Sequence, residues 1–370
     1  MKGQWIGNFS GSSSGQVIVN IDESPSFYQG VVYLHESEAG LPSALAGVVT
    51  TDKKTSFECR AIVFPINPRT RRPDIWANIK ADYDATVNFS TYADIKGSWD
   101  DETLNLSWTT DIGVVGNAVL PRSKAAEPSE LVPENKTWES FKAYVAGLEG
   151  KRYLFRGQST QRRLRTSFHR TGRADLMRFI REDIRTLHQY LSARTRHVFN
   201  LDIGNENGAF FNLVQHHGYP TPLLDWTYSP YVAAFFAYRH ISRDKASTAD
   251  QEDKVRILVF DQAKWRATLP QMLVVESPWL HLSIGEFLAI ENERMIPQQA
   301  ASLVTNIDDI ESYIAAFETL ESKYLRAIDL PVIDRNTVIQ ELRYMGITAG
   351  SMFPGLDGAC EELKERNFDD

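Results

Sequence analysis

The stretch that most constrains the fold of this chain is Gln215–Tyr238, which reads QHHGYPTPLLDWTYSPYVAAFFAY. The glycine and two of the prolines near its start favour a turn or an extended backbone. Leu223–Thr227 then has the pattern of a short buried strand that carries one acid, Asp225. Ser229 is a good N-cap and Pro230 stands at the first helical position, so an apolar helix is predicted to follow. This order of elements brings polar side chains to the edge of a core, where a functional site is expected.

The first part of the chain, residues 1–121, has the pattern of an all-β unit. Short runs in which apolar and polar residues alternate, such as 16–21, 30–34 and 104–108, are separated by clusters of Gly, Ser, Pro and Asp. Alternation of this kind indicates strands joined by turns. We therefore predict an N-terminal all-β barrel or sandwich. Such a unit either senses a trigger, as a ligand in a barrel mouth or a bound protein, or acts as an interaction or inhibitory domain without a pocket.

The rest of the chain divides into a linker and a larger unit. Residues 122–136 are polar, contain prolines and lack periodicity, which indicates a linker. From residue 137 to residue 370, helical and strand patterns alternate, which predicts a C-terminal α+β domain. One predicted helix begins after the N-cap Thr137, and three others span about 173–193, 310–326 and 337–346. One predicted strand ends at Gln158, and three others span 223–227, 255–260 and 287–290.

Composition excludes several classes of protein. The 370 residues include only two cysteines, far apart and without the spacing of a metal site, so neither a disulfide framework nor a zinc centre is expected. The N-terminus lacks the apolar core of a signal peptide, and no run approaches the ~18 apolar residues of a membrane span. A Gly-rich phosphate loop with Lys-Ser or Lys-Thr is also absent. We expect a cytoplasmic protein that does not act at a membrane and uses no metal.

Positive charge is concentrated in one segment of an otherwise acidic chain. The formal net charge is −8, yet residues 151–196 hold 13 Lys and Arg against three acids, a local charge of +10. Such asymmetry points to a polyanion or a phosphate partner, although a solvated helix face would have the same composition. If the partner is nucleic acid, the expected contacts are the arginines of a loop and of the following helix, Arg162, Arg163, Arg165, Arg181 and Arg185.

Three motifs of the larger unit occur together in a known family. Their order along the chain is Phe155-Arg156-Gly157-Gln158, then Gln215-His216-His217-Gly218-Tyr219-Pro220-Thr221, then Leu223-Leu224-Asp225-Trp226-Thr227. These motifs resemble the FRG domain family, and residues 294–299 and 346–358 resemble its later segments. The resemblance covers about 137–364 and leaves the all-β unit outside it.

A second, weaker resemblance concerns the order of the polar residues. ADP-ribosyltransferases of the arginine-first class place an arginine at a strand end, a Ser/Thr motif before an apolar helix, and a glutamate later in the chain. Arg156, the run from Asp225 to Ser229, and the segment Glu291-Asn292-Glu293 follow in the same order. The resemblance implies an ADP-ribosyltransferase-like fold that consumes NAD as its substrate and modifies an acceptor macromolecule.

The chemistry of NAD cleavage gives these residues roles. The planar guanidinium of Arg156 would hold the diphosphate or the ribose through two parallel hydrogen bonds. A carboxylate, from Asp225 or Glu293, would stabilise the positive charge that develops on the ribose. These three are the candidate catalytic residues. The candidate substrate-binding residues are Gln158, His216, His217, Thr227, Ser229, Gln298 and Gln299.

The same residues also have purely structural interpretations. Arg156 and Asp225 would satisfy each other as a buried ion pair, Ser229 would only cap the helix, and Glu293 would be a solvated surface residue. Three functions therefore stay open. The first is an NAD-dependent ADP-ribosyltransferase-like toxin in microbial conflict or phage defence, with a protein or nucleic acid as acceptor. The second is a nuclease or an NAD glycohydrolase, and the third is a module that binds nucleic acid.

Overall fold

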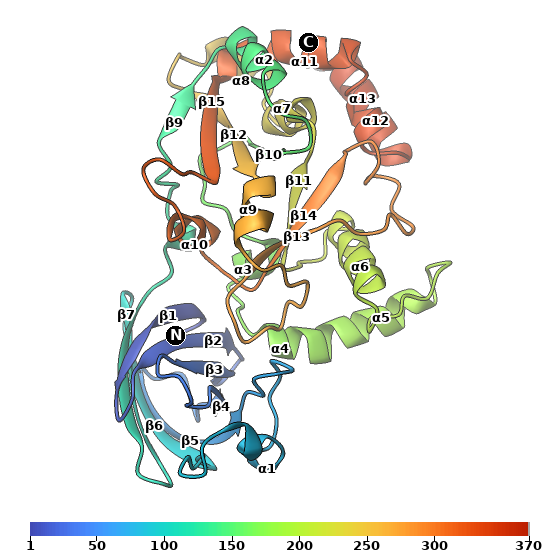
Figure 1. The fold of residues 1–370 in the computed structure, drawn as a ribbon. Helices are drawn as coiled ribbons and strands as arrows, with labels where there is room; N and C mark the ends of the chain where they lie inside the picture. Colours follow the sequence, from blue (N-terminus) through green and yellow to red (C-terminus); the bar gives the residue numbers. More distant parts are fainter. Residues whose placement is uncertain (369–370) are drawn as a thin grey trace.

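The computed structural model describes residues 1–368 and contains two units, one above the other in Figure 1. A β-barrel with the N-terminus lies at the bottom. A sheet covered by helices lies above it and carries the C-terminus. This arrangement confirms the expected all-β unit followed by a unit of strands and helices. No helix within residues 1–368 is long and apolar enough to cross a membrane.

The N-terminal unit is a closed barrel of antiparallel strands, which decides between the predicted barrel and the predicted sandwich. Its strands are β1 (Gly3–Gly11), β2 (Gly15–Glu23), β3 (Tyr28–Glu36), β4 (Ala44–Val49), β5 (Ser56–Pro65), β6 (Tyr92–Trp99), β7 (Thr103–Thr110) and β8 (Val115–Pro121), with α1 (Trp76–Ile79) and η1 (Lys80–Asp82) between β5 and β6. Each strand pairs with the next, and β1 closes the barrel by pairing with β8. Along β2, Val17 and Val19 belong to the interior core, whereas Ile18 between them belongs to a cluster outside the barrel.

The C-terminal unit is built on a seven-stranded sheet. Its strands are β9 (Pro133–Asn135), β10 (Tyr153–Gln158), β11 (Leu223–Thr227), β12 (Lys254–Asp261), β13 (Leu282–Gly285), β14 (Ala300–Thr305) and β15 (Leu325–Pro331). Their order in the sheet is β13-β14-β11-β10-β12-β15-β9. All neighbours are antiparallel except β9, which runs parallel to β15. Residues 122–136 were expected to be a linker. This segment instead ends in β9, a strand of this sheet.

Helices cover both faces of the sheet (Figure 1). They are α2 (Trp138–Ala146), α3 (Ser167–Arg170), α4 (Leu176–Arg178), α5 (Arg185–Ser192), α6 (Gly204–His216), α7 (Pro230–Tyr238), α8 (Arg243–Thr248), α9 (Gln262–Thr268), α10 (Ile310–Ala315), α11 (Arg335–Tyr344), α12 (Ala349–Met352) and α13 (Leu356–Phe368), with η2 (Lys124–Ala126), the π-helix η3 (Phe179–Ile184) and η4 (Val332–Asp334). Alternate residues of β12 face two cores. Ile257 packs with α2, α7 and α11, whereas Leu258 packs with α9 and α10 on the other face.

Three details of the C-terminal unit differ from the sequence prediction. The strand expected at 287–290 does not form, because Phe287 and Ile290 pack on the core around α6 without pairing to a strand. The helix expected to reach residue 326 ends at Ala315, and Leu325 instead begins β15. Helix α6 was not predicted, because two glycines and two asparagines among its first five residues hide the helical periodicity.

The two units contact each other through a buried interface centred on Asp22 of β2. This residue is 1% exposed and accepts hydrogen bonds from Arg173 Nε at 2.8 Å and from the backbone N–H groups of Ala174 and Asp175 at 2.8 and 3.1 Å. The carboxylate therefore joins the barrel to the segment that begins α4. Apolar side chains from both units surround this contact, namely Ile18, Val31, Tyr33, Leu45 and Ile66 of the barrel with Met177, Trp279 and Leu280 of the C-terminal unit.

Asp22→Asn is expected to lower the free energy of unfolding by roughly 3 kcal/mol, because it removes the charge of a buried carboxylate that pairs with the partly exposed Arg173 and accepts two backbone N–H groups. The matched control is Glu23→Gln at the next position, which pairs with Lys2 and Lys53 at the surface and should cost less than about 1 kcal/mol. Urea titration of both variants measures the two losses. Equal losses would show that Asp22 does not hold the interface together.

His169 of α3 predicts a pH-dependent stability. Its ring is fully buried, Nδ1 lies 2.7 Å from Thr166 Oγ1, and burial lowers its pKa to about 4. The folded chain keeps this histidine neutral, whereas the unfolded chain takes up a proton below about pH 6.5. The free energy of unfolding therefore falls as pH drops from 6.5 to 4, by about 3 kcal/mol for this group. His169→Gln should show a shallower decline between pH 7 and pH 4 in urea titrations, and an unchanged decline would contradict this explanation.

Candidate functional site

Residues singled out by the sequence meet in a pocket at the ends of β10 and β11. The pocket has a volume of about 310 Å³ and is also bordered by α6, α7, the segment before β14 and the residue after α12. Five predicted site residues line it, Arg156, His216, Asp225, Thr227 and Gln298. The other lining residues are Phe155, Gly157, Gln215, Trp226, Ala233, Phe236, Arg239, His240, Arg294, Ala300 and Phe353.

Gly157 allows β10 to pack directly against the backbone of α7, next to the pocket. A Cβ atom at this position would lie 1.8 Å from Ala233 O and 2.7 Å from Ala237 N, both in the backbone of α7. Any side chain here would therefore push the helix away from β10. The helix itself begins as the sequence predicted, because Ser229 caps it by accepting the N–H of Val232 at 3.2 Å. The end of β10 and the helix α7 are thus held next to each other.

Arg156 enters the pocket from β10 as a partly buried cation. Its Nη1 donates a hydrogen bond to the backbone carbonyl of Asp225, and its Nε is buried without a hydrogen-bond partner. Burial lowers the pKa of the guanidinium to about 10, against the opposing effect of the Asp225 charge. The side chain is still protonated at neutral pH. The pocket therefore holds a positive charge with an N–H donor that no described residue uses.

Asp225 faces the pocket and is exposed, which corrects the expectation of a buried acid. Leu224 and Trp226 on either side of it belong to the core beneath α9 and α10, so the alternation of β11 turns Asp225 away from that core. Gln215 donates a hydrogen bond to its Oδ1. Arg156 contacts the backbone carbonyl of Asp225 rather than its carboxylate, so the geometry differs from the structural ion pair considered above.

Two arginines outside the predicted set complete the cationic lining. Arg294 donates to the carbonyl of His216 at 2.8 Å, and Arg239 pairs with Glu361 at 2.7 Å. Both guanidinium groups lie over the ring of Phe353, at 4.1 Å for Arg239 and 5.4 Å for Arg294. Among the described residues, the lining thus contains three arginines against one carboxylate. Arg294 stands in a segment of the FRG resemblance, whereas no motif in the sequence marked Arg239.

A second hollow of about 340 Å³ adjoins the pocket. It shares His216 and Arg294 with the pocket, and the predicted residues His217 and Glu293, both exposed, also line it. His216 Nδ1 lies 2.8 Å from Asn292 Oδ1. Glu293 is therefore placed beside the pocket rather than in it. Within residues 1–368, no group of three or more His, Cys, Asp or Glu is arranged to hold a metal ion.

The polar groups of Thr227 and Gln298 are engaged in the fold itself. Thr227 Oγ1 donates to Gln298 O at 2.7 Å and accepts the N–H of Ser229 at 3.0 Å. Gln298 Nε2 donates to Met352 O at 2.8 Å. These bonds tie the end of β11 to two later segments, so they favour a positioning role over direct contact with a substrate. The remaining predicted substrate-binding residues, Gln158, Ser229 and Gln299, do not line the pocket.

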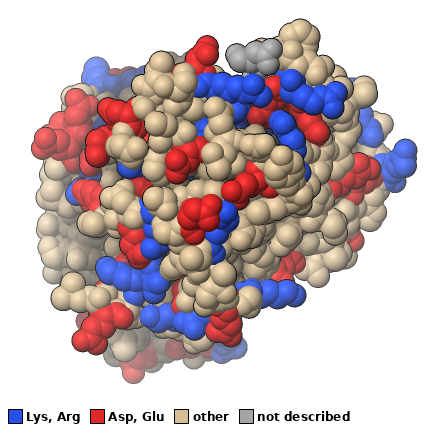
Figure 2. Space-filling view, turned by 90° about the horizontal axis from the view of Figure 1, so that it is seen from above, with Lys and Arg blue, Asp and Glu red and all other residues tan. Residues whose placement is uncertain are grey.

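The arginines predicted to contact nucleic acid fall into two groups. Arg163 is 5% exposed and pairs with Glu130 and Asp309 at 2.6 and 3.2 Å, and Arg165 pairs with Asp308. These ion pairs neutralise both charges within the fold, which favours a structural role for Arg163 and Arg165 over a contact with nucleic acid. Figure 2 shows the face of the molecule that lies at the top of Figure 1. On this face, acidic and basic side chains are interspersed. The exposed members of the set are Arg162, Arg181 and Arg185.

Fold and site together define a protein in which a β-barrel is attached to an α+β unit with a cationic pocket. A model of the FRG domain matches residues 151–246, a range that contains Arg156 and Asp225. The chain therefore contains an FRG domain. The match ends before the segments that contribute Arg294, Gln298 and Phe353 to the pocket. No curated protein and no solved structure matches the chain.

Thr227→Val keeps the shape of the side chain but removes a buried hydroxyl with two partners, so we expect the free energy of unfolding to fall by roughly 1–3 kcal/mol. Ser229→Ala removes the N-cap of α7 and should cost about 1 kcal/mol. The control is Thr109→Val on the exposed face of β7, which should change stability by less than about 0.5 kcal/mol. In urea titration, a Thr227→Val chain as stable as this control would restore the interpretation of Thr227 as a substrate contact.

Proposed function

We propose that this chain is an ADP-ribosyltransferase-like enzyme that uses NAD as its substrate. The observation that carries the proposal is the convergence of Arg156, Asp225 and His216 in one pocket whose lining has three arginines and one carboxylate. An ADP-ribosyltransferase-like fold is part of the proposal. It is supported by the order of the motifs and by the antiparallel pairing of β10 with β11, which places the arginine strand beside the strand of Asp225.

The cationic lining fits a ligand with phosphate groups. Among residues 1–368, Arg156 and Arg294 have no carboxylate partner, and the Nε of Arg156 is a buried donor without an acceptor. A guanidinium binds phosphate oxygens through parallel N–H groups and keeps its charge at physiological pH. The diphosphate of NAD would supply the missing acceptors, and its negative charge would be offset by the excess of arginine. The adjoining hollow gives room for a second part of a dinucleotide.

Asp225 in the pocket and Glu293 in the adjoining hollow would have different roles in the reaction. NAD contributes a ribose–nicotinamide bond whose cleavage leaves positive charge on the ribose. Asp225 would stabilise this charge from within the pocket, and Gln215 would hold the carboxylate in place through its bond to Oδ1. Glu293 would orient the acceptor from the adjoining hollow, where His216 and Arg294 border both spaces.

Within this proposal the FRG domain is the effector and the barrel regulates it. An enzyme that consumes NAD or modifies a macromolecule suits a cytoplasmic toxin of microbial conflict or phage defence. The buried contact at Asp22 joins the barrel to this domain and would transmit a trigger. Either a protein or a nucleic acid is the acceptor, and the exposed Arg162, Arg181 and Arg185 would suit a nucleic acid.

Arg156→Ala should reduce NAD consumption by the full-length chain at least about 100-fold, because the pocket loses the charge that holds the substrate. Arg156→Lys should restore little, since an ammonium group does not reproduce a planar pair of donors. The matched control is Arg60→Ala on the barrel, where the exposed arginine pairs with Asp94, and this variant should keep the wild-type rate. Loss of NAD is measured with labelled substrate in the presence of cell extract, and urea titration verifies that each variant is folded.

The products of this assay separate the alternatives. Label attached to protein or nucleic acid supports the transferase, whereas label found only in free ADP-ribose indicates an NAD glycohydrolase. Nucleic acid that is cleaved indicates a nuclease, and a gel shift at low salt without loss of NAD indicates a binding module. A folded wild-type chain that consumes no NAD with any acceptor contradicts the proposal.

A further inference from the structure

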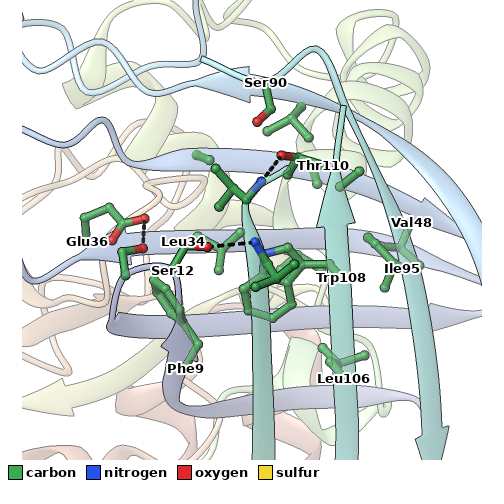
Figure 3. Close-up of a pocket in the computed structure, with 18 of the residues that line it drawn as sticks. Phe9, Ser12, Leu34, Glu36, Val48, Ser90, Ile95, Leu106, Trp108 and Thr110 are labelled. Atoms are coloured by element: carbon green, nitrogen blue, oxygen red, sulfur yellow. Dashed lines mark hydrogen bonds between the residues drawn. The ribbon is translucent and has the colours of Figure 1, made fainter. Parts of the chain in front are cut away.

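The interior of the β-barrel contains a cavity of about 280 Å³ that belongs to the barrel alone (Figure 3). Inward-facing apolar side chains form most of its wall, among them Phe9, Leu34, Ile95 and Leu106. A barrel of eight strands is just wide enough either to be filled by its own side chains or to hold one small ligand. The inward-facing residues of this barrel do not fill it, so there is room for one small ligand.

Small side chains leave the space open. Ala46 and Val48 of β4 and Ala93 of β6 line the cavity, where longer side chains would occupy it. The largest lining residue, Trp108, lies along the wall, because its ring occupies the place of a side chain on Gly116 of the neighbouring strand. A Cβ atom on this glycine would be 2.2 Å from the Trp108 ring. Apolar cavities of this kind stay dry and accept apolar molecules.

One end of the cavity is polar and carries a single charged residue among those described, Glu36. Ser13 donates a hydrogen bond to its Oε1 at 3.0 Å, whereas Oε2 is buried and has no partner among the described residues. Burial raises the pKa of this carboxyl. Figure 3 shows Glu36 on the side of the cavity away from Val48 and Ile95. Among the described residues, the lining contains no Arg, Lys or His, and burial lowers the pKa of the amino group of Met1, which also lines the cavity, to about 5. At neutral pH this amine is uncharged, so no cation in the lining would neutralise an anionic ligand.

We propose that the barrel is a binding site for a small amphipathic molecule, with an apolar body in the cavity and a hydrogen-bond donor on the carboxylate of Glu36. The donor is a hydroxyl or a protonated amine, which supplies the partner that Oε2 lacks. A ligand with a carboxylate head, such as a fatty acid, is disfavoured because its charge would lie beside Glu36 without a cation. This site concerns the barrel and does not depend on the activity proposed for the FRG domain.

The cavity shares a wall with the contact between the two units. Along β2 and β3, Val19 and Val32 line the cavity, whereas Ile18 and Val31 on the opposite side belong to the cluster that includes Trp279 of the C-terminal unit. Only the thickness of one sheet therefore separates a molecule in the barrel from this contact. That is the position from which a bound molecule would act on the FRG domain.

Calorimetric titration of the full-length chain with octylamine, octanol and octanoate tests the proposal, because the three molecules share a tail and differ in the head group. Octylamine and octanol are expected to bind at one site, and octanoate at least about 10-fold more weakly. A folded chain that binds neither octylamine nor octanol overturns the proposal. Equal affinity for octanoate and octylamine overturns it as well.

Two variants locate the site. Ala46→Phe adds a ring inside the barrel and should weaken octanol binding at least about 10-fold. Val49→Phe adds the same ring to the exposed outer face of β4 and should leave binding unchanged. Glu36→Gln should weaken octylamine binding about 10-fold, whereas Glu58→Gln on the exposed face of β5 should not. Wild-type affinity of a folded Glu36→Gln chain for octylamine would overturn the assignment of the polar end.

Discussion

The close contact between β10 and α7 at Gly157 is the constraint on which the candidate site depends. The backbone of α7 occupies the space that a side chain at this position would need, so strand and helix touch directly. The contact brings Arg156 to the carbonyl of Asp225 at the end of β11. The start of the same helix fixes Thr227, whose hydroxyl holds the backbone of Gln298. One packing contact thus positions groups from three separate segments around the pocket.

The sequence predicted those elements of the fold that have a local signal in the chain. Alternation within residues 1–121 indicated strands, and the Ser229-Pro230 pair indicated the start of α7. Barrel closure was not predictable, because β1 and β8 are far apart in the chain and their pairing has no local signal. The exposure of Asp225 depended on which side of β11 the core covers. Arg239 reaches the pocket only through tertiary packing against the ring of Phe353, so no motif could have marked it.

The two units place hollows of opposite character in one chain. The pocket of the C-terminal unit is rich in arginine, whereas the barrel cavity is apolar and has one carboxylate among the described residues, Glu36. A phosphorylated substrate and an amphipathic molecule would therefore not compete for the same site. Coupling between the two would pass through the contact around Asp22 and the outer faces of β2 and β3. Such coupling requires that the ligand bind two states of this contact with different affinity.

We propose above all that the pocket at the ends of β10 and β11 receives an anionic ligand on its arginines. Calorimetric titration of the full-length chain with ADP-ribose, at low and at physiological salt, tests it most directly, because binding is measured without turnover. We expect one binding site per chain, with an affinity that falls as the salt concentration rises. A folded chain that binds no ADP-ribose at low salt would contradict the assignment of this pocket.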